Sequence, residues 1–270
     1  MGSTLITEDL IRSDKLFDVV GGAAGAILSL LKLYRICKNS AVLECALSCG
    51  QHLLRSRPPR DRHFGVWHQP TSEFPLTGFS HGAAGFAYAL ASLATASGDN
   101  CYLEAACDCR LYEQTMYSHQ CRNWKDLRHA EKLEAFCCQW CHGAAGICIA
   151  RIGMLKYGGD AHDGKHEVEH AIETVRDTAL SDVDTLCCGN MGRVEALIEA
   201  AKALGRADLL KHARQMAQVV LIRANRRKGF GWVVGGDSDN IGFFTGAAGL
   251  GYSLLRCAHP DDLPCILMWE

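Results

Sequence analysis

The sequence predicts an all-α protein with the architecture of an α/α toroid, in which a ring of inner helices is surrounded by outer helices. Three observations support this fold class. A Gly-x-x-Gly motif recurs along the chain, an apolar segment follows each copy, and segments with one apolar stripe lie between copies. Buried helices that alternate with half-buried helices assemble naturally as a ring of helical hairpins, with the glycine turns at one end of the inner ring.

The glycine motif defines the repeat. Its five copies are Gly22-Ala23-Ala24-Gly25, Gly82-Ala83-Ala84-Gly85, Gly143-Ala144-Ala145-Gly146, Gly189-Asn190-Met191-Gly192 and Gly246-Ala247-Ala248-Gly249. The second glycines of successive copies are 60, 61, 46 and 57 residues apart. Inner helices are predicted directly after them, at residues 26–34, 86–96, 147–157, 193–204 and 250–258. These segments are apolar around most of their circumference, which indicates burial on several sides.

Two of the intervening segments have the pattern of outer helices, with one apolar stripe and one polar face. In residues 165–179 the stripe consists of Val168, Ile172, Val175 and Ala179. In residues 207–223 it consists of Leu210, Ala213, Ala217 and Val220. Both stripes have helical spacing, so these helices are expected to cover the inner ring.

Two irregular stretches separate repeats. Residues 57–76 contain four prolines and are predicted to form a loop. Residues 229–242 are rich in glycine, and we expect a short hairpin through residues 230–234. Neither stretch has the composition of an interdomain linker, so residues 1–270 are predicted to form one domain.

Composition excludes several classes of protein. A chain of 270 residues with 48% hydrophobic and 21% charged residues can bury a large core, and its net charge of -2 argues against nucleic acid or anionic lipid as a partner. No segment approaches the roughly 18 uninterrupted apolar residues of a membrane helix, and the N-terminus lacks a signal-peptide pattern. We therefore expect a cytoplasmic protein. Its 15 cysteines are expected to be mostly reduced thiols, because their odd number and scattered spacing do not suggest a disulfide framework.

The motif glycines have a predicted physical role. A turn with positive φ that crowds two helix starts together has no room for a Cβ atom. The next helix would then direct unpaired N–H groups and its positive dipole end at the central cavity, which would lower the pKa of a cysteine placed there. The first and fifth copies carry no ligand, and we assign them to packing. The other three copies directly follow His81, the Cys141-His142 pair and the Cys187-Cys188 pair.

Cys141, Cys187 and Cys188 are the candidate metal ligands. Three thiolates that meet at the mouth of the inner ring would hold zinc and leave one coordination position open, which is the arrangement of a catalytic site. The alternative is a closed structural zinc site in which Cys137, Cys138 or His142 supplies the fourth ligand.

Several motifs in order resemble a known family. They are the five glycine turns, Phe79-Ser80-His81-Gly82, Trp140-Cys141-His142-Gly143, Leu186-Cys187-Cys188-Gly189-Asn190, and Leu263-Pro264-Cys265-Ile266-Leu267. Together they resemble the lanthionine synthetase C-like proteins, and most closely the C-terminal cyclase domain of bifunctional class II lanthipeptide synthetases. The resemblance runs from about Phe17 to the last residue. It implies an α/α toroid with central zinc that adds thiols of a dehydrated precursor peptide to dehydroalanine or dehydrobutyrine, forming lanthionine and methyllanthionine rings.

The resemblance also implies roles for individual residues. Cys141 and Cys187 match the first two zinc ligands, and Cys188 stands where much of the family has a histidine. A subset of class II enzymes with broad substrate tolerance has a similar all-cysteine set. His81 matches the acid/base histidine, and Asp18 matches an aspartate near the active site. From the residues alone, His81 could instead be a capping or core histidine, Asp18 could cap the helix that begins near Gly22, and His142 could either assist proton transfer or pack.

The chemistry of these residue types agrees with the implied reaction. Binding to zinc deprotonates a cysteine thiol, whose ordinary pKa is about 8.5. After the thiolate adds to the β-carbon, a proton must reach the α-carbon, and an imidazole such as that of His81 is suited to this transfer near neutral pH. Three protein thiolates and one substrate thiolate make the zinc site formally dianionic. We expect the bound substrate thiolate to be more nucleophilic there than in a histidine-containing site.

Two departures from the family pattern shape the expectation. Cyclase domains have seven hairpins, whereas this chain shows five, and it lacks the dehydratase domain of a bifunctional enzyme. The expected function is that of a zinc-dependent cyclase, with a second polypeptide that completes the toroid as an expected partner. Alternative functions are a non-catalytic protein that binds thiol peptides or glutathione, and an inactive fragment that needs a partner. A zinc prenyltransferase would need a basic diphosphate pocket and an Asp/Cys/His ligand set, which the sequence does not show.

Overall fold

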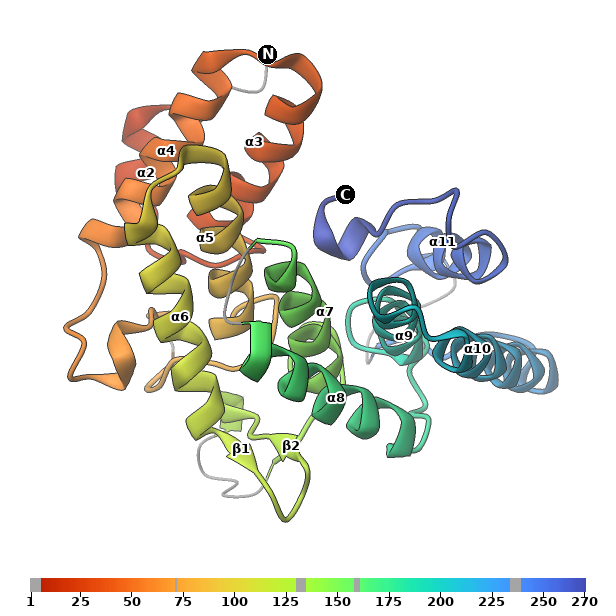
Figure 1. Cartoon of the computed structure of the whole chain (residues 1–270). Helices are drawn as coiled ribbons and strands as arrows, with labels where there is room; N and C mark the ends of the chain where they lie inside the picture. Colours follow the sequence, from red (N-terminus) through yellow and green to blue (C-terminus); the bar gives the residue numbers. More distant parts are fainter. Residues whose placement is uncertain (1–5, 71, 130–134, 158–160, 234–238) are drawn as a thin grey trace.

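The computed structural model describes residues 6–70, 72–129, 135–157, 161–233 and 239–270 and confirms the predicted fold class (Figure 1). One inner helix follows each glycine motif, and each packs against the next. They are α3 (Ala23–Cys37), α5 (Ala83–Ser97), α7 (Ala144–Leu155), α9 (Asn190–Leu204) and α11 (Ala247–Ala258). Four outer helices each pack on the preceding inner helix. They are α4 (Ser40–Arg55), α6 (Asn100–Thr115), α8 (Ala161–Asp177) and α10 (Ala207–Arg227).

Short elements complete the chain. They are α2 (Glu8–Ser13), β1 (Tyr117–Ser118), β2 (Asn123–Trp124) and the 3-10 turns η1 (His63–Gly65), η2 (Leu127–His129) and η3 (Ile266–Met268). No helix in the described ranges is both long enough and apolar enough to cross a bilayer. After α11 the chain turns back to the inner ring (Figure 1), where the Met268 carbonyl accepts a hydrogen bond from the Tyr88 hydroxyl and the Trp269 indole donates to Ser29.

The outer helices bury the predicted stripes with two differences. In α8, Val168, Ile172 and Val175 are buried, but the helix ends at Asp177 and Ala179 is exposed. In α10, Ala213, Ala217 and Val220 are buried, whereas Leu209 rather than Leu210 begins the stripe. A one-residue offset of this kind arises because the contact with the inner helix, rather than helical spacing alone, selects the buried side chain.

Buried arginines join helices to one another through ion pairs. Arg151 of α7 is fully buried and binds Glu113 of α6 at 2.8 Å and Glu167 of α8. Arg256 of α11 similarly binds two carboxylates of α9, which belong to Glu195 and Glu199. Removing one member of such a pair leaves a buried charge without a partner and typically costs about 3–5 kcal/mol, so these pairs fix how the helices face one another.

The second glycine of each motif is needed mainly because a backbone carbonyl lies very close to it. Expected positive φ is found only at the first glycine of the third copy, Gly143 (φ 98°), whereas the first glycines of the other four copies have φ between -122° and -132°. At the second glycine, an added Cβ would lie 1.7–2.3 Å from the carbonyl oxygen six residues earlier in all five copies. The prediction of positive φ was therefore wrong for four copies, while the predicted lack of room for a Cβ is confirmed.

The first turns of the inner helices are capped by their own loops. The N–H of Gly25 donates to the Asp18 carbonyl, that of Gly146 to Gln139, and that of Ala247 to Asn240, each seven residues earlier. Met191 and Asp184 repeat the arrangement. These N–H groups are paired, so the expectation that unpaired N–H groups point at the central cavity was wrong at these positions.

The expected hairpin at residues 230–234 is not present in its described part. Residues 230–233 form no strand, and residue 234 lies outside the described ranges. A hairpin that the sequence did not predict joins α6 to α7, where Tyr117 pairs with Trp124 and Ser118 with Asn123. Each strand has only two residues, which is too short for an alternating pattern to be recognised.

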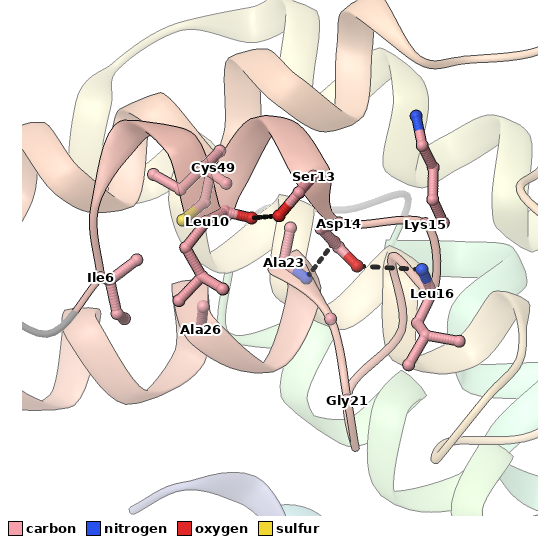
Figure 2. A pocket seen from close by; sticks show the side chains of 12 residues that line it. Ile6, Leu10, Ser13, Asp14, Lys15, Leu16, Gly21, Ala23, Ala26 and Cys49 are labelled. Carbon is pink, nitrogen blue, oxygen red and sulfur yellow. Dashed lines mark hydrogen bonds between the residues drawn. The ribbon is translucent and has the colours of Figure 1, made fainter.

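Helix α2 packs on α4, and its C-cap residue, Asp14, reaches the start of α3. Figure 2 shows the Asp14 carboxylate accepting hydrogen bonds from the N–H groups of Ala23, at the start of α3, and of Leu16. A largely apolar pocket of about 530 Å³ lies beside this cap. Val20, in the loop before α3, and Ile36, near the end of α3, are exposed apolar side chains.

We predict that glycine substitutions separate the close-approach positions from ordinary helical positions. Gly146→Ala would place a Cβ 1.9 Å from the Trp140 carbonyl oxygen, and should lower the free energy of unfolding by about 2–4 kcal/mol. Gly251→Ala in α11 meets no atom within 4 Å and should raise it by up to about 1 kcal/mol. Urea unfolding measures both, and equal effects would contradict the packing explanation.

Candidate functional site

Backbone hydrogen bonds connect the five loops that precede the inner helices. Val19 N–H donates to the Ser80 carbonyl (3.1 Å), Ser80 N–H to Cys141 (3.2 Å), Cys141 N–H to Cys187 (3.3 Å) and Cys187 N–H to Phe244 (2.8 Å). Ser80, Cys141, Cys187 and Phe244 each stand two residues before the first glycine of their motif. This ladder of backbone hydrogen bonds makes residues from different repeats direct neighbours.

The ladder brings the three candidate ligands together. The Cys141 and Cys188 sulfurs are 3.5 Å apart, those of Cys187 and Cys188 are 3.3 Å apart, and all three lie within 4.8 Å of one another. Cys141 is 3% exposed, while Cys187 and Cys188 are partly exposed. Among the described residues, this trio is the group of histidine, cysteine and acidic side chains that can hold a metal ion.

The residues considered as a fourth ligand face other partners. Cys137 Sγ accepts a hydrogen bond from Arg128 at 3.8 Å, and His142 Nδ1 lies 3.2 Å from the Thr77 carbonyl oxygen. Cys138 lies close to Arg193, whose charge opposes the rise in thiol pKa that burial causes. In the described part of the chain, none of the three joins the sulfur trio. This geometry favours an open fourth position over a closed structural site.

The three thiols affect one another's pKa. Hydrogen bonds to Cys141 and Cys187 lower the pKa of Cys188 to about 3. Hydrogen bonding to Cys187 and Cys188, and then burial, raise the pKa of Cys141 above its ordinary range. The three thiols are therefore coupled, and ionisation of one opposes ionisation of the others. A divalent metal ion stabilises the remaining thiolates, because metal binding and loss of thiol protons are coupled.

Asp18 and His81 form a pair beside the trio. His81 Nδ1 donates to Asp18 Oδ2 at 2.8 Å, and Asp18 Oδ1 accepts from the N–H groups of Val20 (3.0 Å) and Gly21 (2.8 Å). Burial acts to raise the pKa of Asp18, but the hydrogen bonds from His81 and Gly21 outweigh it and hold the pKa below 3.8. Asp14, not Asp18, accepts from the first N–H of α3. Asp18 thus stiffens the turn at residues 18–21, which leads into α3, and orients His81.

His142 packs beside His81. The two rings are stacked with centroids 5.8 Å apart. His142 is buried, and burial, followed by the charge of Arg128, lowers its pKa to about 4. The Thr77 carbonyl can only accept, so His142 carries its proton on Nδ1 and keeps a lone pair on Nε2. The same peptide group donates the Gly78 N–H to buried Glu113 at 2.8 Å, which fixes its orientation.

Sequence reasoning missed three residues of this site. Gln69 Nε2 contacts both Asp18 Oδ2 and His81 Nδ1, Glu113 holds the Thr77–Gly78 peptide, and Arg128 lies beside Cys137 in an ion pair with Asp126. Gln69 belongs to the proline-containing loop, and Glu113 to an outer helix. Neither carries a local signal, because each acts only through contacts with distant segments.

We predict one divalent metal ion per chain. Single substitutions of Cys141, Cys187 and Cys188 by alanine should each abolish it, because each removes one of three sulfurs that converge on one position. Cys138→Ala should retain the metal ion, since this buried thiol lies outside the trio. Elemental analysis of the purified variants measures the metal content. Loss of metal in the Cys138 variant would restore the closed-site interpretation.

We also predict a pH-dependent contribution of Asp18 to stability. Its pKa is lowered in the folded state, so its stabilisation is fully present above the unfolded pKa and is lost as pH falls through the folded pKa. At pH 6, Asp18→Asn should lower the free energy of unfolding by about 1–3 kcal/mol. The difference should shrink below pH 3.8. Asp61→Asn, at an exposed position, serves as the control.

Comparisons with known proteins agree with this geometry. A search of curated proteins found no sequence match. Nisin cyclase superimposes with a TM-score of 0.70 at 17% identity, over 96% of this chain and 70% of that chain. A cellobiose 2-epimerase from Bacillus thermoamylovorans B4167 gives 0.55 at 13% identity, over 79% and 63% of the two chains. A polysaccharide lyase gives 0.56 at 10% identity, over 88% and 73%.

These structural identities are low, so the superpositions show a shared fold and do not by themselves assign an activity. The sequence comparison is more specific. The model of the family described as "Lanthionine synthetase C-like protein" matches residues 3–268, which is nearly the whole chain. This chain belongs to the lanthionine synthetase C-like protein family.

Proposed function

We propose that this protein is a zinc-dependent lanthipeptide cyclase. Its substrate is a dehydrated precursor peptide, and it adds a cysteine thiol of that peptide across the double bond of dehydroalanine or dehydrobutyrine. The observation that carries the proposal is the placement of three converging sulfurs and an Asp–His pair on adjacent loops of one ladder. Family membership and the fold shared with nisin cyclase support a cyclase-type function.

The sulfur trio fits zinc. Zinc–thiolate bonds of about 2.3 Å in a tetrahedron place sulfurs about 3.8 Å apart. The observed separations of 3.3 and 3.5 Å need to open by only a few tenths of an ångström. The all-sulfur donor set is also one that zinc prefers in proteins. Zinc bound there would supply a Lewis acid that deprotonates the peptide thiol in the open fourth position.

His81, oriented by Asp18, would transfer the proton that the α-carbon takes up. Addition forms a bond between the peptide sulfur and the β-carbon, and the α-carbon then takes up a proton, so no atom is lost or gained. His81 has Nδ1 engaged by Asp18, which leaves Nε2 for proton transfer. Its side chain is 33% exposed, in contrast to the buried Asp18, so a peptide can reach the imidazole. Asp18 orients the ring and stabilises its protonated form.

Incubation with a dehydrated precursor peptide tests this proposal. Ring formation should protect cysteine thiols from alkylation without changing the mass of the peptide. His81→Asn should lower the rate by about 10²–10⁴-fold while retaining the metal ion, because it removes the proton-transfer group. His166→Asn on the surface of α8 should match the wild type. A wild-type protein that binds the peptide but leaves every thiol alkylatable would support the alternative of a non-catalytic binder.

The all-cysteine ligand set gives a second prediction. Replacing one thiolate by a neutral imidazole reduces the negative charge on zinc, which should hold the substrate thiolate more tightly and make it less nucleophilic. Cys188→His should therefore retain zinc and cyclise more slowly than the wild type. Single-turnover rates at equal zinc content measure the effect. An unchanged or faster variant would contradict the charge argument.

A further inference from the structure

Gln69 lies against the shared atom of the Asp18–His81 pair. Its amide nitrogen donates to Asp18 Oδ2 and lies 2.9 Å from His81 Nδ1, while Nδ1 itself lies 2.8 Å from the same carboxylate oxygen. The other oxygen, Oδ1, is already engaged by the N–H groups of Val20 and Gly21. Oδ2 therefore serves two donors that come from different parts of the chain.

The amide and the imidazole compete for this oxygen. A carboxylate oxygen that receives a second hydrogen bond has less negative charge available for the first. With no second donor on Oδ2, the carboxylate would hold a proton on the imidazole nitrogen more tightly. A proton held that tightly is transferred poorly, since a general acid works best when its proton affinity matches the working pH.

We propose that Gln69 is a positioning residue that shares Asp18 Oδ2 with His81 and so limits how strongly the carboxylate holds the imidazolium proton. This inference rests on the proposed function, in which His81 transfers a proton. Gln69 acts through Asp18 and is not assigned a contact with substrate. The side chain comes from the loop between α4 and α5, so this loop contributes to the chemistry as well as connecting two repeats.

Other titratable and charged groups also lie near His81. The His142 ring stacks on it from the loop before α7, and Asp126 and Arg128 act electrostatically on His142 from the segment after β2. Glu113 reaches the same region through the Gly78 N–H. The sulfur trio lies on the loops before α7 and α9. Among the described residues the Gln69 side chain is hydrogen-bonded only to Asp18 and His81, so the effect of a substitution should report on that pair.

The test compares wild type, Gln69→Met, Asp18→Asn and the double variant, all as full chains loaded with zinc. Methionine keeps the length of the side chain and removes the donor. In Gln69→Met, the basic limb of the pH profile of kcat/KM for cyclisation should move upward by about 0.5–1 pH unit, the equivalent of one hydrogen bond. In the Asp18→Asn background the same substitution should cause no shift, because the two residues act as one unit. Glu73→Gln, in the same loop and exposed, should match the wild type.

A second measurement does not depend on turnover. Nitrogen NMR of the His81 imidazole at a fixed pH near 7 should show a larger protonated fraction in Gln69→Met than in wild type. If wild type forms no thioether but the imidazole responds as expected, the proposed function fails and the hydrogen-bond competition stands. If cyclisation proceeds and neither the pH profile nor the imidazole spectrum changes in a folded Gln69→Met protein, the inference is overturned.

Discussion

The ladder of backbone hydrogen bonds between the loops is the constraint on which the site depends. Each bond joins the loops of neighbouring repeats, from Val19 through Ser80, Cys141 and Cys187 to Phe244. Backbone groups are present whatever the side chains are, so the ladder can place different chemistry at each position while its geometry stays the same. Here it sets candidate metal ligands from the third and fourth repeats side by side, and the imidazole of the second repeat stacks on that of His142 in the third.

The glycine motifs allow this ladder to form. The second glycine of each copy lets the carbonyl six residues earlier lie against the start of the helix, and the first-turn N–H groups bond to carbonyls seven residues earlier. Each loop is thereby held against the start of its own helix. Buried ion pairs, such as those that join Arg151 of α7 to α6 and α8, fix the positions of the helices relative to one another. These paired N–H groups and buried ion pairs both stabilise the end of the ring where the loops meet.

The sulfur trio and the imidazole of His81 lie in two different environments. Burial and mutual hydrogen bonding couple the ionisation of the three sulfurs, so a bound cation would stabilise their thiolate forms. The imidazole of His81 lies beside a carboxylate but remains partly open to solvent, which suits a group that must exchange protons with a peptide. His142, buried and held by the Thr77 carbonyl, is neutral near pH 7. The proposed proton-transfer group and the candidate metal ligands therefore lie in different environments, and the buried ring of His142 stacks on the former.

Local pattern in the sequence determined the five inner helices, two of the outer helices and the choice of the three cysteines as candidate ligands, because glycine spacing and apolar periodicity depend on residues within a few turns of one another. It did not determine the conformation of the glycines, the short hairpin after α6, or the residues Gln69 and Glu113. Those features depend on contacts between segments that lie far apart in the chain. Tertiary structure alone decided that the sulfurs converge without a fourth protein ligand in the described chain and that Asp18 Oδ2 serves two donors, since only folding brings those atoms within hydrogen-bond and coordination distance.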